Sequence, residues 1–115
     1  MDDCIFCKII AGQIPGDFVY KDEKVVAFKD IHPEAPVHIL IVPREHIVSV
    51  TDIKTDKQSS LIGNMVMIAN KIAKEQKISD SGFRLVINAG QEGGQLVQHL
   101  HMHLLGGKQL NGRLG

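Results

Sequence analysis

The sequence lacks an excess of charge of either sign, because its thirteen lysines and arginines are balanced by thirteen aspartates and glutamates. A chain without a basic excess does not present the broad positive surface by which proteins hold nucleic acid non-specifically. A nucleotide ligand would therefore be recognised by shape and by local chemistry. Nucleic acid is not an expected partner.

Long apolar runs and cysteine are also scarce. No stretch approaches the roughly 20 residues that cross a membrane, and the acidic start at residues 1–3 lacks the basic and apolar regions of a secretory signal. We therefore expect a cytoplasmic protein with no membrane partner. Cys4 and Cys7 are the only cysteines. In a reducing compartment, such a pair favours a metal clamp or a redox dithiol over a structural disulfide.

The apolar pattern predicts one α+β domain over residues 1–115, a length that suits a single core. Short connections between the expected strands favour a mostly antiparallel sheet of five strands, covered by one long amphipathic helix and preceded by a short N-terminal helix. The predicted helices span 5–10 and 56–76, and the predicted strands span 18–21, 25–28, 38–42, 83–88 and 99–105.

Three of the six histidines stand in one segment of five residues, 99–103, where they alternate with apolar residues. Successive side chains of a strand point to opposite faces, so the three imidazoles would line one face about 6.6 Å apart. Leu100 and Met102 would then point into a core. This row suits a ligand that carries a phosphate. The alternative, a half-buried strand with an incidental polar face, is improbable for three histidines in strict alternation.

The glycine-rich loop before the histidines, with Gly93 and Gly94, can bring backbone N–H groups close to an anion. Attack on phosphorus by imidazole needs such donors, and it needs an acceptor for the proton of the second ring nitrogen. The other interpretation of the loop is a flexible connection between strands. Judged alone, Asp30 and Asn88 fit turn residues better than ligand contacts.

Cys4 and Cys7 are three residues apart, so they would share one face of a helical turn and could bind one ion. A thioredoxin-like dithiol follows a strand, which is not predicted here, and metal is therefore favoured over redox chemistry. Two thiolates and two histidines would complete a tetrahedral, structural zinc site. The spacing does not select the two histidines, and two buried cysteines without a ligand are the alternative. The candidates are His32, His38, His46, His99, His101 and His103.

Taken together, these segments resemble the histidine triad (HIT) family, and specifically its nucleotide-binding Hint branch. The resemblance runs from Cys4 to about Gln109 and is carried by residues 5–10, 27–31, 33–38, 43–47, 94–95 and 99–107. It implies a HIT-like homodimer in which two five-stranded sheets join into one. It also implies a purine nucleotide site on each subunit.

The resemblance assigns a role to each candidate site residue. His101 would be the nucleophile that attacks the α-phosphorus and forms a nucleotidyl-histidine, which water then hydrolyses. The other catalytic residues would be His103, at the phosphate or leaving group, and His38, which supports the cluster. The nucleotide-binding residues implied are Asp30, Ile31, Asn88, Gly94 and Gln95, with Ile5, Phe6, Ile9 and Phe28 as the apolar wall around the base. Structural zinc would bind Cys4, Cys7, His46 and His99.

The activity implied is hydrolysis of purine nucleoside phosphoramidates. The alternatives are a dinucleoside polyphosphate hydrolase, whose motif usually runs into residues other than Leu105-Gly106-Gly107, and a non-catalytic nucleotide- or zinc-binding signalling module. Two features depart from the branch. Leu96 stands where some members carry a small hydroxyl residue near the leaving group, which leaves Gln95 as a candidate contact. Residues 108–115 lack the tryptophan-proline tail that helps to shape the leaving-group side.

Overall fold

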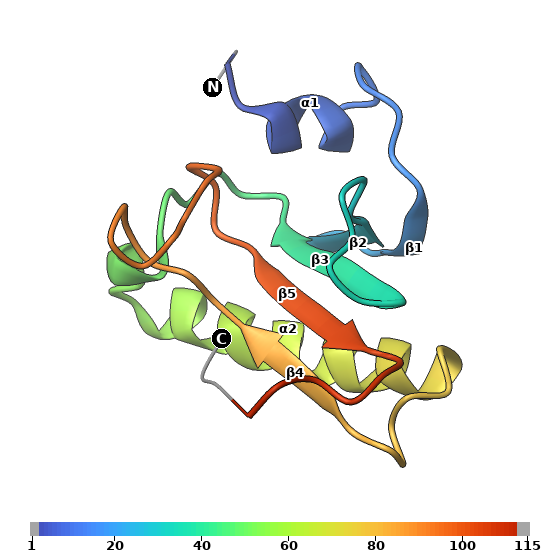
Figure 1. The fold of residues 1–115 in the computed structure, drawn as a ribbon. Helices are drawn as coiled ribbons and strands as arrows, with labels where there is room; N and C mark the ends of the chain where they lie inside the picture. The colour runs from blue at the N-terminus through green and yellow to red at the C-terminus, as the bar shows by residue number, and fades with distance from the viewer. Residues whose placement is uncertain (1–2, 113–115) are drawn as a thin grey trace.

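The computed structural model describes residues 3–112 as a five-stranded antiparallel sheet with one helix on each face (Figure 1). The elements in chain order are α1 (Ile5–Ile10), β1 (Phe18–Lys21), β2 (Val25–Lys29), β3 (Val37–Pro43), a short 3-10 turn (Val50–Asp52), α2 (Asp56–Glu75), β4 (Phe83–Val86) and β5 (Met102–Gly106). The strand order is β1-β2-β3-β5-β4, and every neighbouring pair is antiparallel. The predicted α+β class is confirmed.

The two ends of helix α2 are set by a capping box at its start and by a residue of positive φ just after its end. Thr55 accepts a hydrogen bond from the Gln58 N–H while the Gln58 side chain accepts from the Thr55 N–H, so this capping box satisfies N–H groups that lack helical partners. The helix ends before Lys77, whose φ of 62° is outside the helical region. Its buried residues recur at three- and four-residue spacing: Leu61, Met65, Ile68, Ala69, Ile72 and Ala73. Among residues 3–112, neither helix combines the length and the apolar character that a membrane span requires.

The sheet has an apolar cluster on each face, because the side chains of its strands alternate. In β3, Ile39 and Ile41 belong to the larger cluster, which includes the buried face of α2. Leu40 and Val42 belong to the smaller cluster under α1, together with Phe6. This smaller cluster draws on α1 and on β2 and β3, so α1 covers only that side of the sheet.

The fifth strand starts later than predicted, at Met102 instead of residue 99. In the β3–β5 register Ile41 pairs with Met102, so extending the ladder would bring the chain opposite Pro43, which has no N–H to donate. The chain turns away at this point, and the Leu100 N–H bonds to the Ile47 carbonyl instead. The predicted alternation of faces still holds, since Leu100 and Met102 lie in the α2-side core. The strand predicted over 83–88 likewise ends early, at Val86.

Candidate functional site

A cavity of about 590 Å³ opens on the α1 side of the sheet, within the size range of small-molecule sites. It is lined by residues from α1, from the loop after β2, from β4 and β5 and from the segment between these two strands. Almost all the predicted catalytic and nucleotide-binding residues line it: Ile5, Phe6, Ile9, Phe28, Asp30, Ile31, His38, Asn88, Gly94, His101 and His103. The fold therefore collects residues that lie up to 98 positions apart in the sequence.

Gln95 is the exception, because it does not line this cavity. Its buried side-chain amide donates to the carbonyls of Val48 and Val97, at 2.7 and 3.0 Å, while its oxygen accepts from the Gly90 N–H. Gln95 thus holds the loop in place. The Gly94 N–H donates to the Gln91 carbonyl inside the same loop, and does not point to a ligand as expected.

Asn88 and Gly93 fix the rest of this loop. The Asn88 side-chain N–H donates to the Gly93 carbonyl at 2.8 Å. A Cβ on Gly93 would lie 2.3 Å from the Ala89 carbonyl oxygen, so the tight turn requires glycine there. Gly94 therefore lines the cavity in a loop whose tight turn depends on Gly93.

His101 is held in one tautomer by the backbone. Its Nδ1 lies 2.7 Å from the His99 carbonyl oxygen, which can only accept, so Nδ1 carries the ring proton and Nε2 keeps a lone pair. The ring is buried and meets the Phe6 ring edge-on, with centroids 5.0 Å apart. Burial lowers the pKa of His101. A neutral imidazole with a free Nε2 lone pair is the form that acts as a nucleophile.

His38 and His103 form a chain of hydrogen bonds that starts at a backbone amide. The Glu34 N–H donates to His38 Nδ1 at 3.1 Å, so the ring proton of His38 is on Nε2. That N–H donates to His103 Nδ1 at 2.9 Å, and Asp30 Oδ2 lies 3.4 Å from the same His38 nitrogen. The ring proton of His103 is consequently on Nε2. Burial, together with the neighbouring His101 and His38, lowers the pKa of His103 to about 4.

The remaining nitrogens of these rings face the cavity. Within residues 3–112, every buried side-chain nitrogen or oxygen has a hydrogen-bond partner. His101 Nε2 and His103 Nε2 bond to no protein atom and both rings line the cavity, so these two nitrogens are accessible from it. His101 thus presents a lone pair to the cavity and His103 presents an N–H donor, and the centroids of the two rings are 4.9 Å apart.

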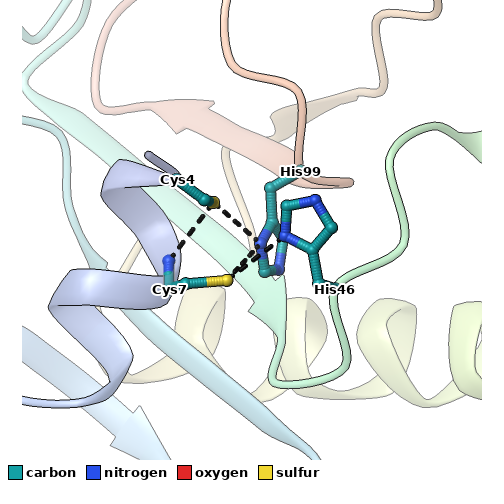
Figure 2. A group of neighbouring side chains, drawn as sticks. All are labelled: Cys4, Cys7, His46 and His99. Carbon is teal, nitrogen blue, oxygen red and sulfur yellow. Dashed lines mark hydrogen bonds between the residues drawn. The ribbon is translucent and has the colours of Figure 1, made fainter. Parts of the chain in front are cut away.

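A second group of side chains lies at the start of α1, where Cys4, Cys7, His46 and His99 converge (Figure 2). Cys4 Sγ is 3.3 Å from His99 Nδ1, and Cys7 Sγ is 3.2 Å from His46 Nδ1. One ligand atom from each of the four residues lies within 4.8 Å of all the others. These residues are therefore close enough to hold a metal ion.

The protonation of this group also fits a metal. His99 Nε2 lies 2.8 Å from the Pro43 carbonyl oxygen, so it carries the ring proton and Nδ1 directs its lone pair at the sulfurs. Burial lowers the pKa of His99, which keeps the ring neutral. Burial and the neighbouring Cys4 raise the pKa of the Cys7 thiol. A cation between the sulfurs would offset their mutual repulsion and allow both to deprotonate.

Asp30, His38 and His103 also lie close enough to one another to hold a metal ion. The hydrogen bonds argue against it, since both nitrogens of His38 are engaged: Nδ1 accepts from Glu34, and Nε2 carries a proton. His38 therefore has no free lone pair for a metal. The hydrogen bonds of this cluster instead fix which nitrogen of His38 and of His103 carries the ring proton.

Comparisons with known proteins agree with this arrangement. The family model DcpS_C, described as scavenger mRNA decapping enzyme C-term binding, matches residues 3–113. The purine nucleoside phosphoramidase of Escherichia coli (strain K12) is 48% identical over 109 residues, which are 95% of this chain and 91% of that protein. The chain belongs to the HIT family. Its predicted membership is thereby confirmed, and the family assignment makes the chain a hydrolase.

Solved HIT structures share the whole fold. A histidine triad protein from Clostridium difficile has a TM-score of 0.94 and 47% identity, covering 99% of this chain and 98% of that one. A HIT family hydrolase from Legionella pneumophila has a TM-score of 0.93 and 44% identity, covering 98% of this chain and all of that one. The match includes both helices and the sheet.

Two kinds of HIT site residue were missed at the level of sequence. Val86 and Leu105 line the cavity beside His103, and their place in the strand alternation was a signal that could have found them. The Glu34 N–H and the Pro43 carbonyl also act on the histidines, but through the backbone. Residue type gives no signal for such contacts.

Proposed function

We propose that this chain hydrolyses purine nucleoside 5′-phosphoramidates at the P–N bond, with His101 as the nucleophile. The observation that carries the proposal is the His101 ring, whose Nδ1–H donates to a carbonyl while Nε2 faces the cavity. The name of the Escherichia coli relative supports this choice of substrate. Covalent catalysis of this kind divides one difficult displacement into two easier ones.

In the first step, the His101 Nε2 lone pair forms a bond to the α-phosphorus, and the P–N bond breaks with its electron pair on the departing nitrogen. The His103 Nε2–H donates a hydrogen bond to that nitrogen, which takes its proton from a water in the cavity, so the amine leaves neutral and a hydroxide remains. In the second step, the hydroxide oxygen bonds to phosphorus and the P–N bond to His101 breaks. A nucleoside monophosphate is released, and both imidazoles are neutral as at the start.

The nucleoside is proposed to lie on the β1–β2 side of the cavity. There the Phe6 and Phe28 rings meet edge to face, with centroids 5.6 Å apart, and Ile5 and Ile9 extend this apolar wall along α1. A flat purine gains both burial and ring contacts from such a wall. Asp30, which lines the cavity between this wall and the histidines, supplies carboxylate oxygens to accept from the ribose hydroxyls. Ile31 lies beside it on the rim, and Asn88 and Gly94 border the phosphate.

We also propose that the metal of the second site is structural zinc. Two thiolates and two imidazoles are a common zinc ligand set, and four protein ligands leave no position for water. Cys4 and Cys7 come from the start of α1, whereas His46 follows β3 and His99 precedes β5. Bound zinc would therefore fix α1, which forms one wall of the cavity, to the segment that carries His101.

A cytoplasmic homodimer is the proposed working form. Strand β4 is at the edge of the sheet, where its outer backbone groups can pair with another strand. Two free cysteines suit a reducing compartment. Light scattering at micromolar concentration should give twice the chain mass of 12.7 kDa. A fully active monomer would contradict the dimer.

The test of the activity offers the purified protein four substrates in parallel: adenosine phosphoramidate, guanosine phosphoramidate, a nucleotidyl-amino-acid conjugate and a dinucleoside polyphosphate. We expect the phosphoramidates to be hydrolysed fastest. Faster cleavage of the polyphosphate would reassign the substrate class. Binding of a nucleoside monophosphate without turnover of any compound would indicate a binding module instead of an enzyme.

A further inference from the structure

Three of the exposed large apolar side chains of this chain lie around the cavity. Ile5, Ile31 and Leu96 all line it, although their side chains are 43%, 81% and 92% exposed. Apolar side chains gathered at the mouth of a cavity mark a surface that a ligand covers. Ile5 and Ile31 adjoin the proposed nucleoside side. Leu96 belongs to the loop between β4 and β5, away from the side on which the nucleoside is proposed to bind.

The floor beside Leu96 is apolar too. Val86 pairs with His103 in the β4–β5 register, and Leu105 follows His103 by two residues, so all three side chains share the α1-side face of the sheet. Both Val86 and Leu105 line the cavity. Neither belongs to the cluster under α1, whose buried strand residues come from β2 and β3. The cavity thus continues past the histidines onto an uncovered apolar surface.

Charge differs between the two sides of the cavity. The carboxylates that line it are those of Asp17, Asp30 and Glu34, all of which precede β3. From Val86 onward, the ionisable residues of the lining are histidines. Arg84 pairs with Leu105 on the same face of β4, and its guanidinium donates to the Asn111 carbonyl. An ammonium group bound over this surface would find no lining carboxylate, and the nearest charged residue on the same face of β4, Arg84, is itself a cation.

We propose that Leu96, Val86 and Leu105 form an apolar subsite for the leaving amine, which selects uncharged alkyl or aryl amines over amines that carry an ammonium group. The proposal rests on the phosphoramidase activity proposed above. In an in-line displacement the departing nitrogen lies opposite the attacking His101 Nε2. With the nucleoside toward β1 and β2, the amine then lies toward β4, over this surface.

The experiment uses three phosphoramidates of one purine nucleoside, made with methylamine, pentylamine and 1,4-diaminobutane. The last two are nearly equal in length and differ by a terminal ammonium group. We expect kcat/KM for the pentylamine compound to exceed both others by about tenfold or more, the effect expected of added methylene groups in an apolar subsite. Equal kcat/KM for all three would overturn the subsite and leave the activity in place. No turnover of any compound would overturn both.

Two variants locate the effect. Leu96→Ser should lower kcat/KM for the pentylamine compound about tenfold more than for the methylamine compound, because it removes apolar contact from the leaving group only. Met67→Ser is the matched control, since Met67 is also exposed and apolar but lies on α2, outside the cavity. It should change neither value. If Leu96→Ser lowers both values equally, or converts a dimer to a monomer in light scattering, Leu96 does not form the subsite.

Discussion

The two clusters of side chains that include His99 and His103 use imidazole in opposite ways, although these two histidines are only four residues apart. In the group of Cys4, Cys7, His46 and His99, imidazole nitrogens point at sulfur. In the group of Asp30, His38 and His103, one imidazole donates to another. Both groups satisfy the spacing of a metal site. Spacing of ligand atoms is therefore not enough to separate metal chemistry from proton chemistry.

The backbone makes the difference. A carbonyl on His99 Nε2 holds the proton there and frees Nδ1 for the sulfurs. A backbone N–H on His38 Nδ1 does the reverse, since it occupies that lone pair and moves the proton to Nε2. Between them, His101 donates Nδ1–H to the His99 carbonyl and keeps its lone pair for the cavity. The partner of one nitrogen therefore decides what the other can do.

The largest expected effect tests the free lone pair of His101. His101→Ala should lower phosphoramidate turnover by several orders of magnitude, on the scale of other deleted nucleophiles. Binding of a nucleoside monophosphate should persist, because most contacts with the nucleotide remain. Mass spectrometry of the quenched parent reaction should find a nucleotidyl group on the peptide that contains His101. A nucleotidyl group on another residue would show that His101 is not the nucleophile.

His103→Ala tests the donor at the end of the His38 chain and should have a smaller effect. It removes the hydrogen-bond donor to the leaving nitrogen and leaves the nucleophile, so turnover should fall by about a hundred- to ten-thousandfold, the range of general acid–base contributions. A substrate whose leaving amine is weakly basic needs less help from an acid and should be much less affected. A loss that is equal for weakly and strongly basic amines would contradict the role of donor.

Removing the metal ligands tests the other group, through stability. Cys4→Ser and Cys7→Ser should each lower the metal content from about one zinc per chain. A metal present at 1,000 times its Kd stabilises the folded state by about 4 kcal/mol, so Tm should fall by more than about 10 °C. A chelator should lower the Tm of the parent but not of the double variant. Unchanged metal content in both single variants would place the metal elsewhere.

Much of this comparison was predictable from the sequence, because it depends on periodicity and on residue type. The spacing of apolar residues predicted α2 to within one residue of its end, and alternation predicted the faces of Leu100 and Met102. The four proposed metal ligands and the catalytic and nucleotide-binding residues predicted for the cavity came from the resemblance to the HIT family. Nothing in the structure tests their individual roles, which stay predictions.

What the sequence could not predict depends on backbone groups brought together by the fold. The start of β5 at Met102 follows from Pro43 opposite it, a pairing known only once the register is known. The position of Gln95 likewise depends on Val48, which is 47 residues away. The tautomers of His38 and His99 are set by one amide and one carbonyl of remote loops. Such contacts have no residue-type signature.

The smallest expected effect is the pH dependence that His103 gives to stability. Its pKa is lowered to about 4 in the folded chain, whereas an unfolded chain has a histidine pKa of about 6.5. As the pH falls from about 6.5 to 4, the unfolded state gains a proton that the folded ring excludes, so stability falls through this window. The contribution is fully present above about pH 6.5 and amounts to no more than about 3 kcal/mol.

The variant His103→Gln removes this contribution. Urea unfolding of parent and variant at equal metal loading should therefore show the parent losing more stability between pH 6.5 and 4. If stability changes with pH equally in parent and variant, the pKa of His103 is not lowered in the folded chain. The contrast between the His103 cluster and the metal group would then be wrong.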